Sequence, residues 1–405
     1  MSIHRQECDA RLAAGPISLA ATVVVYLGFA LTGVAVTLLG SALPALTRQF
    51  ALSDLRAGSL FAAQFLCSTL GAMFSGRLVS LCGFRVVLVG GFALIAIGIA
   101  ALAFVTWPSC LLPICCYGVG VGMAIPACNL HVAAANPHRR ASALNILNFV
   151  WTGGALAWAP FAAGLSARPR SFLFLGLFVA LFTVCLALTR LQNGIPAQED
   201  VRSASTPGPP VSAYLLTALL FFLYIGIESS WAGWATSYAQ RMNATTRLWM
   251  FAPSFFWGAL LAGRALAPIF LKRVSEDLLL ILDLVLATAA GCFVLAVASM
   301  ILLSAGLSVL GFALASVYPN LIARMTRDLE GNTGATGYMF AAASTGGAVL
   351  PWVVGAVSSR FGGIRTGLAV AIAASAIMLV IQISRCRRTS AAVQTASPST
   401  AAVES

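Results

Sequence analysis

Charge is scarce in this sequence. Only 9% of its 405 residues are charged and 60% are hydrophobic, whereas about 25% of an average soluble domain is charged. A globule of this length could not cover its surface with so few charged side chains, which excludes a soluble enzyme and a disordered chain. The bases are spread through short gaps between apolar runs, unlike the clustered basic patch of a nucleic-acid-binding module. We therefore expect no nucleic-acid partner.

The spacings typical of disulfide, metal and nucleotide sites are also missing. The ten cysteines include no C-x-x-C pair, and most lie in apolar runs, where cysteine is a small packing residue. Gly118, Gly120 and Gly122 follow no predicted strand, so they indicate close helix packing rather than a dinucleotide loop. We expect no metal, no cofactor and no enzymatic activity.

Long apolar runs dominate what is present. Each run supplies the about 20 residues that an α-helix needs to cross the bilayer. They cover approximately residues 17–45, 57–80, 85–105, 109–135, 142–166, 172–190, 211–238, 248–271, 277–297, 300–325, 333–358 and 364–384, with a turn expected at 299–304. The pattern predicts an all-α membrane protein with twelve transmembrane helices.

The basic residues between the runs predict the orientation in the membrane. With a cytoplasmic N-terminus, 15 bases fall in inside segments and 8 in outside segments, and Arg264 remains within a helix. Cytoplasmic loops of membrane proteins carry an excess of basic residues. We expect a multi-pass protein of the cell membrane with both termini in the cytoplasm.

The chain divides into two halves. Residues 191–210 are polar and rich in proline, which predicts a cytoplasmic linker between six-helix bundles at 1–190 and 211–388. Residues 389–405 are rich in Ser, Thr and Ala and predict a disordered tail.

The two halves repeat at nearly one offset. Four motifs recur in the same order: Tyr26-Leu27-Gly28-Phe29 and Tyr224-Ile225-Gly226-Ile227; Gly71-Ala72 with Gly76-Arg77 and Gly258-Ala259 with Gly263-Arg264; Pro126 with Asn129 and Pro319-Asn320; Thr152-Gly153-Gly154-Ala155 and Thr345-Gly346-Gly347-Ala348. Parallel repeats of this kind build a group of transporters whose substrate site lies near mid-bilayer between the halves.

The loop between the second and third runs carries a family motif. The major facilitator superfamily has G-x-x-x-D-R-x-G-R at this place. Gly76 and Gly83 match its two glycines, and Arg85 lies one position beyond its last arginine, whereas Ser80 and Leu81 replace the acid and the middle arginine. With the repeated halves, this motif makes nearly the whole chain resemble that superfamily.

Within the superfamily, segment 222–228 with Trp231 and Trp234 resembles the seventh helix of the fucose-permease-like branch. The resemblance implies the twelve-helix major facilitator fold with alternating access. It also implies a gating role for the motif loop and its repeat; these gating candidates are Gly76, Arg77, Gly83, Arg85 and Arg264.

Glu228 is the most informative single residue, because it lies well inside the seventh run among apolar neighbours. A carboxylate in hydrocarbon costs about 2.5 kcal/mol or more, so it should face a cavity or a partner. A carboxyl that gains and loses a proton as access alternates would couple transport to the proton gradient. The alternative is a neutral acid hydrogen-bonded to another helix.

Arg264 is an obvious counter-ion for Glu228, but its position favours a gate. Its counterpart Arg77 lies at the cytoplasmic end of a helix. Arg264 also lies some sixteen residues into its run, about 24 Å along the axis, nearer the cytoplasmic face than the midplane. A substrate or Glu228 is the alternative partner.

Two other titratable residues favour structural interpretations. Asp283 follows the helix start Ser275-Glu276-Asp277 in a peripheral helix, and we interpret it as a structural acid near the membrane interface. His131 lies toward the cytoplasmic end of the fourth run, where a structural role is favoured and a proton relay is the alternative.

Polar and aromatic residues suggest a sugar-like solute. Asn145, Asn148 and Trp151 are spaced by three and share one helix face. Amides and an indole can hydrogen-bond hydroxyls and stack on a sugar ring, although amides also join helices. The substrate-binding candidates are Gln64, Asn129, Asn145, Asn148, Trp151, Tyr224, Trp231 and Asn320.

We therefore predict a monomeric secondary transporter that moves a small polar solute across the bilayer by alternating access, coupled to protons. The alternative is proton-linked efflux of amphipathic compounds. Gly154, Pro160 and Gly164 match part of the glycine/proline pattern of drug antiporters and keep this alternative open.

Overall fold

The computed structural model describes residues 19–136, 139–165, 170–191, 211–243, 247–328 and 333–396, and within them it contains helices and no strands. In chain order the elements are α2 (Leu19–Gln49), α3 (Asp54–Ala101), α4 (Leu111–Ala135), α5 (Arg140–Leu165), α6 (Arg170–Leu188), α7 (Val211–Met242), the 3₁₀ helix η2 (Arg247–Phe251), α8 (Ala252–Phe270), α9 (Glu276–Ala296), α10 (Met300–Leu314), α11 (Val317–Asp328), α12 (Thr333–Arg360) and α13 (Ile364–Ala396).

The helix α3 contains two of the predicted spans. Its 48 residues would extend about 72 Å at 1.5 Å per residue, more than twice the roughly 30 Å hydrocarbon core. Gly83 divides it, with φ of 80° and ψ of 164°, a left-handed conformation that favours glycine. The second motif glycine therefore makes the turn between the two arms.

Ten stretches of the described chain are long and apolar enough to cross a membrane. One of them is α3, whose two arms correspond to two of the predicted spans. The 26-residue α5 is a further long helix in addition to the ten. The hydrophobic runs of the sequence therefore correspond to the helices of the structure.

Three boundaries differ from the sequence prediction. The turn expected at 299–304 lies earlier, because α9 ends at Ala296 and α10 begins at Met300. The tenth run is interrupted at Ala315 and Ser316, between α10 and α11. The last helix continues to Ala396, into the segment predicted as a tail, and residues 397–405 lie outside the described chain, as do residues 192–210 of the expected linker.

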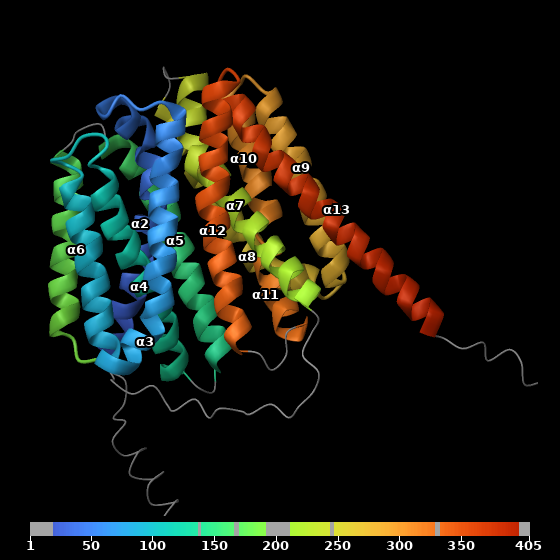
Figure 1. The fold of residues 1–405 in the computed structure, drawn as a ribbon, viewed down its shortest axis with the longest axis horizontal. Coiled ribbons are helices and arrows are strands. Elements are labelled where there is room, and N and C mark those ends of the chain that lie inside the picture. The colour runs from blue at the N-terminus through green and yellow to red at the C-terminus, as the bar shows by residue number, and fades with distance from the viewer. Residues whose placement is uncertain are drawn as a thin grey trace, which may run out of the picture.

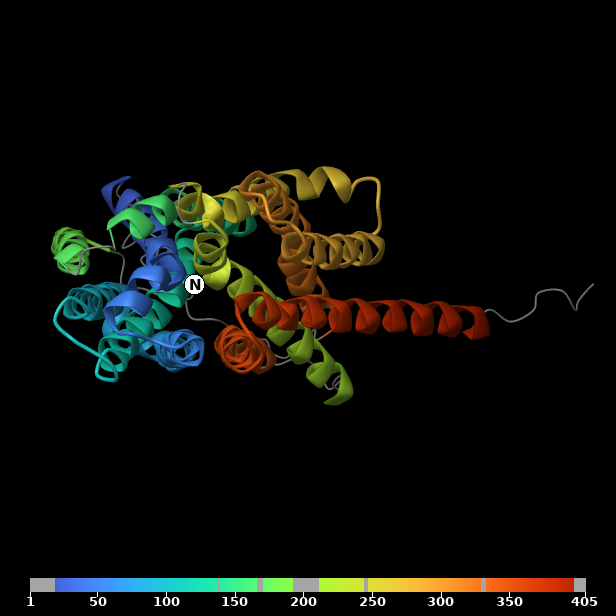
Figure 2. The ribbon, with the colours of Figure 1, turned by 90° about the horizontal axis from the view of Figure 1, so that it is seen from above.

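The helices form two groups. Figures 1 and 2 show α2 to α6 on one side and α7 to α13 on the other, with the end of α13 extending away from the bundle. Helices α2, α3 and α5 of the first half meet α7, α8 and α12 of the second half. We call this contact the seam. Its latch end holds Asp54 and Arg241, and its kink end is the end of the bundle at which Gly83 turns α3.

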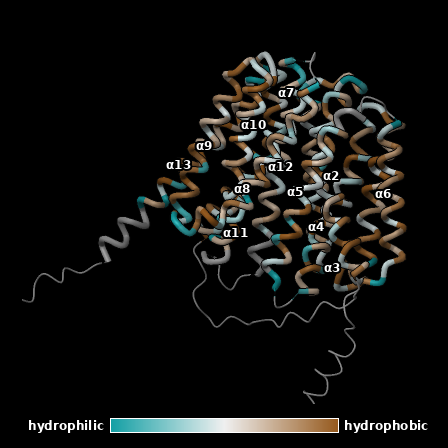
Figure 3. The backbone as a smooth tube through the Cα atoms, turned by 180° about the vertical axis from the view of Figure 1, so that it is seen from behind, coloured by the Kyte–Doolittle hydropathy of each residue, from teal (hydrophilic) through white to brown (hydrophobic). Residues whose placement is uncertain are grey.

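Hydrophobic residues recur along all the helices, as the brown stretches of the backbone in Figure 3 show. On α6, Phe174, Leu177, Phe178 and Leu181 are each more than half exposed. Their spacing of three and four residues places them on one face of the helix. Such a face suits lipid rather than water, because exposed apolar patches of this size are rare on soluble proteins.

Candidate functional site

Glu228 lies in the middle of α7 with only 9% of its surface exposed. Tyr224, one helical turn earlier, donates its hydroxyl to Glu228 Oε2. The same hydroxyl lies 3.2 Å from the carbonyl oxygen of Leu314, the last residue of α10. The carboxyl is therefore held against the break between α10 and α11.

Arg264 of α8 is the charged neighbour of Glu228. Its Nη2 lies 4.0 Å from Glu228 Oε2, and its Nη1 donates to Thr152 Oγ1 on α5, over 3.2 Å. The sequence favours a gating role for Arg264 and leaves Glu228 as the alternative partner; the structure places the guanidinium beside Glu228 and also in contact with the opposite half. The side chain joins the acid of one half to a hydroxyl of the other half.

This contact continues a series that runs along α8 and α5. Ser254 donates to the carbonyl of Leu156 over 3.1 Å, and the ring of Trp257 meets Trp151 edge-on at 5.5 Å between centroids. In this series Arg264 is the α8 residue nearest the kink end. The α5–α8 contacts therefore end, on the side of the kink end, at the group formed by Glu228, Arg264 and Thr152.

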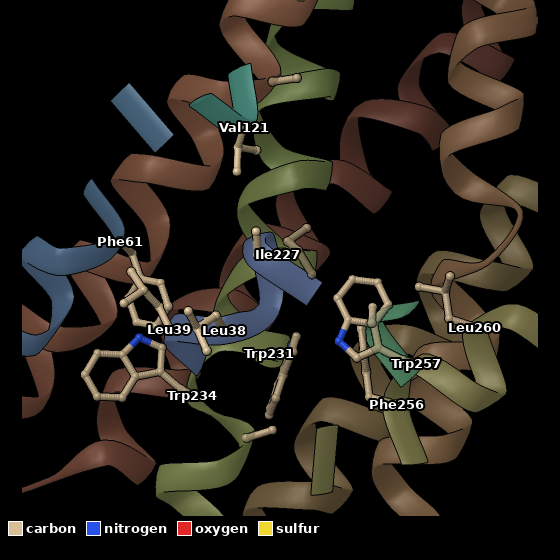
Figure 4. Packing of buried hydrophobic residues seen from close by; sticks show 14 of the residues in the cluster. Leu38, Leu39, Phe61, Val121, Ile227, Trp231, Trp234, Phe256, Trp257 and Leu260 are labelled. Carbon is tan, nitrogen blue, oxygen red and sulfur yellow. The ribbon is translucent and has the colours of Figure 1, made fainter. Parts of the chain in front are cut away.

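Aromatic rings pack beside the charged pair and farther along α7. Tyr318 of α11 stacks on Tyr224 with centroids 5.7 Å apart and an interplanar angle of 28°. Phe221 meets Tyr318 edge-on at 5.9 Å. Nearer the latch end, Figure 4 shows Phe61 of α3 beside Trp234 of α7, with centroids 6.0 Å apart.

The predicted polar face of α5 lies on the side toward the second half. Trp151 and Thr152 both contact α8, and Asn148 and Asn145 precede them on the same face. Both asparagines are exposed, and Asn148 Nδ2 donates to Leu144 in its own helix. The face therefore presents accessible amides between the kink end and Arg264.

Other substrate-binding candidates lie inside their own halves. Gln64 is 1% exposed and donates to the Val36 carbonyl of α2 over 3.2 Å. Asn129 donates to Ile125 in its own helix. The Trp231 ring packs toward Gly291 of α9, a peripheral helix, so the structure does not bring it to the charged pair. Asn320 is 5% exposed, and its Nδ2 has no hydrogen-bond partner among the described residues.

The motif loop is fastened within the first half. Arg85 donates to the carbonyl of Ala187 near the end of α6, and the carbonyl of Arg77 accepts from Ser80. A side chain added at Gly76 would meet nothing within 4 Å. These contacts hold the turn of α3 to its own bundle.

The latch end contains a charged contact that the sequence analysis missed. Asp54, at the start of α3, accepts from both terminal nitrogens of Arg241 on α7 and from the hydroxyl of Ser358 on α12. The neighbouring Leu55 amide donates to Ser359 Oγ over 2.7 Å. We call these residues the latch. No local pattern predicts it, because its partners are 187 and 304 residues apart.

Two remaining titratable residues are buried. Asp283 accepts from the hydroxyl of Ser316 at the α10–α11 break and is 9% exposed, which fits the structural role expected for this acid. His131 is 3% exposed and packs edge-on against Phe84, next to Gly83, with ring centroids 5.1 Å apart.

A model of the Major Facilitator Superfamily matches residues 25–335, and the chain belongs to this superfamily, whose members are transporters. It is accordingly an integral, multi-pass membrane protein. A search of curated protein sequences found no match.

Solved structures share the fold at low sequence identity. A bacterial homologue of the human lysosomal transporter Spinster has a TM-score of 0.73 and 15% identity, over 92% of this chain and 98% of that chain. The D323A mutant of nucleoside transporter NupG has 0.70 and 16%, over 90% and 98%. The transporter FucP has 0.58 and 18%, over 91% and 98%.

Proposed function

We propose that this protein is a secondary active transporter that moves a small, polar, sugar-like solute by alternating access, coupled to protons at Glu228. The observation that carries the proposal is the Arg264 contact. One guanidinium lies 4.0 Å from a buried acid in the second half and bonds a hydroxyl in the first half. A change of charge at Glu228 would therefore act directly on a contact that alternating access must break and form.

The contacts across the seam support an inward-facing state. The latch joins the halves at one end, and the α5–α8 series continues as far as Arg264. Beyond it the main contacts of α4 are with α2, α3 and α5, and those of α11 are with α7, α9 and α10, each within its own half. With the orientation predicted from the basic residues, the latch end is extracytoplasmic and the kink end faces the cytoplasm.

Structural neighbours agree with this proposal. The Spinster homologue was solved in an inward-facing and occupied conformation, whereas FucP was solved in the outward conformation. A further neighbour is a D-xylose-proton symporter, with a TM-score of 0.70 and 15% identity. The exposed amides of Asn145 and Asn148 would bond hydroxyls of such a solute.

The oligomeric state, the membrane and the orientation of the protein are also part of this proposal. It would work as a monomer in the cell membrane, with both termini in the cytoplasm, with protons and a small solute as partners and without nucleic acid. Each charged group at the seam would then alternate between contact with its partner and contact with the solute or a proton.

Proteoliposomes with an imposed pH gradient test the coupling. We expect Glu228→Gln to abolish solute accumulation but to retain counterflow exchange, because the amide keeps the shape and cannot release a proton. The control Asp283→Asn makes the same change at another buried acid of the same half, and we expect it to accumulate solute. Accumulation by Glu228→Gln at the level of the unmodified protein would contradict proton coupling. Extrusion of lipophilic cations instead of sugar uptake would favour the efflux alternative.

A further inference from the structure

Arg264 has hydrogen-bonding capacity that the protein does not use. A guanidinium carries five N–H donors in a fixed planar fork. Nη1 donates to Thr152, whereas Nη2 lies 4.0 Å from Glu228, beyond hydrogen-bond distance. Nε is buried and has no hydrogen-bond partner among the described residues. The arginine is thus incompletely paired in the interior of a membrane protein, where unpaired polar groups are costly.

Glu228, in contrast, has a close partner of its own. The Tyr224 hydroxyl donates to Oε2, and the tyrosine ring is fixed by stacking on Tyr318. The acid is therefore held by α7 itself and does not depend on the arginine for its position. Arg264 is the looser member of the pair, and its side chain is also the more exposed one, at 21% against 11%.

Accessible amides lie on α5 between the kink end and Arg264, whose own side chain is 21% exposed. Asn145 and Asn148 are exposed on the face that leads to Thr152, the residue that Arg264 bonds. A solute entering from the kink end would meet amides first, which suit hydroxyl groups, and the guanidinium afterwards. The order of these groups matches a molecule with hydroxyls along its length and an acidic group at one end.

We propose that the solute is a hydroxylated carboxylic acid, whose carboxylate binds the Arg264 guanidinium after Glu228 has taken up a proton. This inference rests on the proposed transport function and names its substrate class. The planar fork of arginine fits a carboxylate with two parallel hydrogen bonds. A neutral sugar would leave those donors unused.

The charges require the proton and the solute to bind together. Without solute, Arg264 and an ionised Glu228 sum to zero. A second carboxylate at the same arginine would add a negative charge beside Glu228, and repulsion between like charges disfavours that state. Binding of one proton to Glu228 restores the balance. One anion and one proton therefore move together, and the transported charge is zero.

Three matched pairs of solutes test the substrate class: D-glucuronate with D-glucose, D-galacturonate with D-galactose, and D-gluconate with D-glucitol. In each pair a carboxylate replaces a CH₂OH group. Thermal unfolding of the purified full-length protein reports binding, because a ligand stabilises the state it binds. We expect at least one acid to raise the Tm at acidic pH and its neutral partner to raise it much less.

Two variants link the binding to the named residues. Arg264→Lys should weaken binding of the acid at least tenfold, because an ammonium cannot form the paired contact, whereas Arg360→Lys at the far end of α12 should leave it unchanged. Above the pH at which Glu228 loses its proton, affinity should fall tenfold per pH unit in the unmodified protein, as linkage to one proton requires. In Glu228→Gln this slope should vanish while binding persists.

Several results would overturn the proposal. The first is a neutral sugar or polyol that binds as tightly as the acid with which it is paired. The second is that none of the three acids changes the Tm. The third is that Arg264→Lys binds the acid as tightly as the unmodified protein. If neutral sugars accumulate under a pH gradient, this proposal fails while proton-coupled sugar transport stands. If acids bind as described but no solute crosses proteoliposomes that contain the protein, the transport function itself fails.

Discussion

The latch gives a measurable prediction about the equilibrium between the two states of the transporter. Asp54 accepts hydrogen bonds from Arg241 and Ser358, both in the opposite half. These bonds exist only while the latch end is closed. Asp54→Asn keeps the size of the side chain but removes the charge, so we expect it to shift the population toward the state open at the latch end.

The size of the shift follows from the exposure of the pair. The Arg241 side chain is 41% exposed and that of Asp54 is 12% exposed. Fully exposed ion pairs contribute about 0–1 kcal/mol, and hydrogen bonds to charged groups contribute about 1.5–3 kcal/mol. A half-exposed, doubly bonded pair lies between these limits, at about 1–2 kcal/mol, which corresponds to a roughly 5–30-fold change in population.

Distances between spin labels can measure this shift. Phe104 and Leu248 are exposed, lie at the latch end and belong to different halves, so each can be changed to Cys and labelled in a protein whose ten native cysteines are replaced. We expect the long-distance population to grow in Asp54→Asn.

The matched control is Asp277→Asn. Asp277 pairs with Arg324 inside the second half, so its loss should not change the distance between the labels. An unchanged distribution in Asp54→Asn, or an equal change in Asp277→Asn, would refute the assignment of the latch as a gate.

Three other changes probe the seam and the core. Gly40→Ala would place a methyl group 2.8–2.9 Å from the α7 backbone and should open the latch end, whereas Gly76→Ala meets nothing within 4 Å and should not; the same label pair reports both. Thr152→Val removes the hydroxyl that Arg264 bonds, so transport in proteoliposomes should slow, and Tm should fall as well because Nη1 loses its partner; unchanged transport would show that this bond takes no part in the transport cycle. Asp283→Leu leaves the Ser316 hydroxyl buried without its partner and should cost about 1–3 kcal/mol of stability, seen as a lower Tm, whereas Asp283→Asn should keep most of it; equal Tm values for the two variants would contradict this account.

The sequence predicts the architecture well because the membrane requires long apolar helices, and their length can be read directly. It also predicts the turn at Gly83 through the family motif. The break at Ala315 and Ser316 was missed, although Pro319 provides a signal. A proline ring clashes with the carbonyl four residues earlier, and that residue is Ala315.

The candidate site was predicted less completely. Glu228 could be found because it is an acid inside an apolar run, and Tyr224 because it lies four residues earlier in the same run, one helical turn away. The pairing of Arg264 with Glu228 was only the alternative interpretation, because the repeat relates backbone positions between halves and says nothing about the register of α8 against α7. Thr152 and the latch involve residues distant in sequence, and such contacts leave no local pattern.

The glycines of the seam determine how the two halves can slide past each other. A methyl group on Gly40 would lie 2.8 Å from the Cα of Gly233, and one on Gly58 would lie 3.1 Å from the Cα of Trp352. Main chains therefore meet almost directly at these points, and a side chain added at either glycine would push the facing helix of the other half away. The tightness of the closed latch end is therefore set by residues without side chains, and a single methyl group at Gly40 is enough to disturb the fit of the two halves.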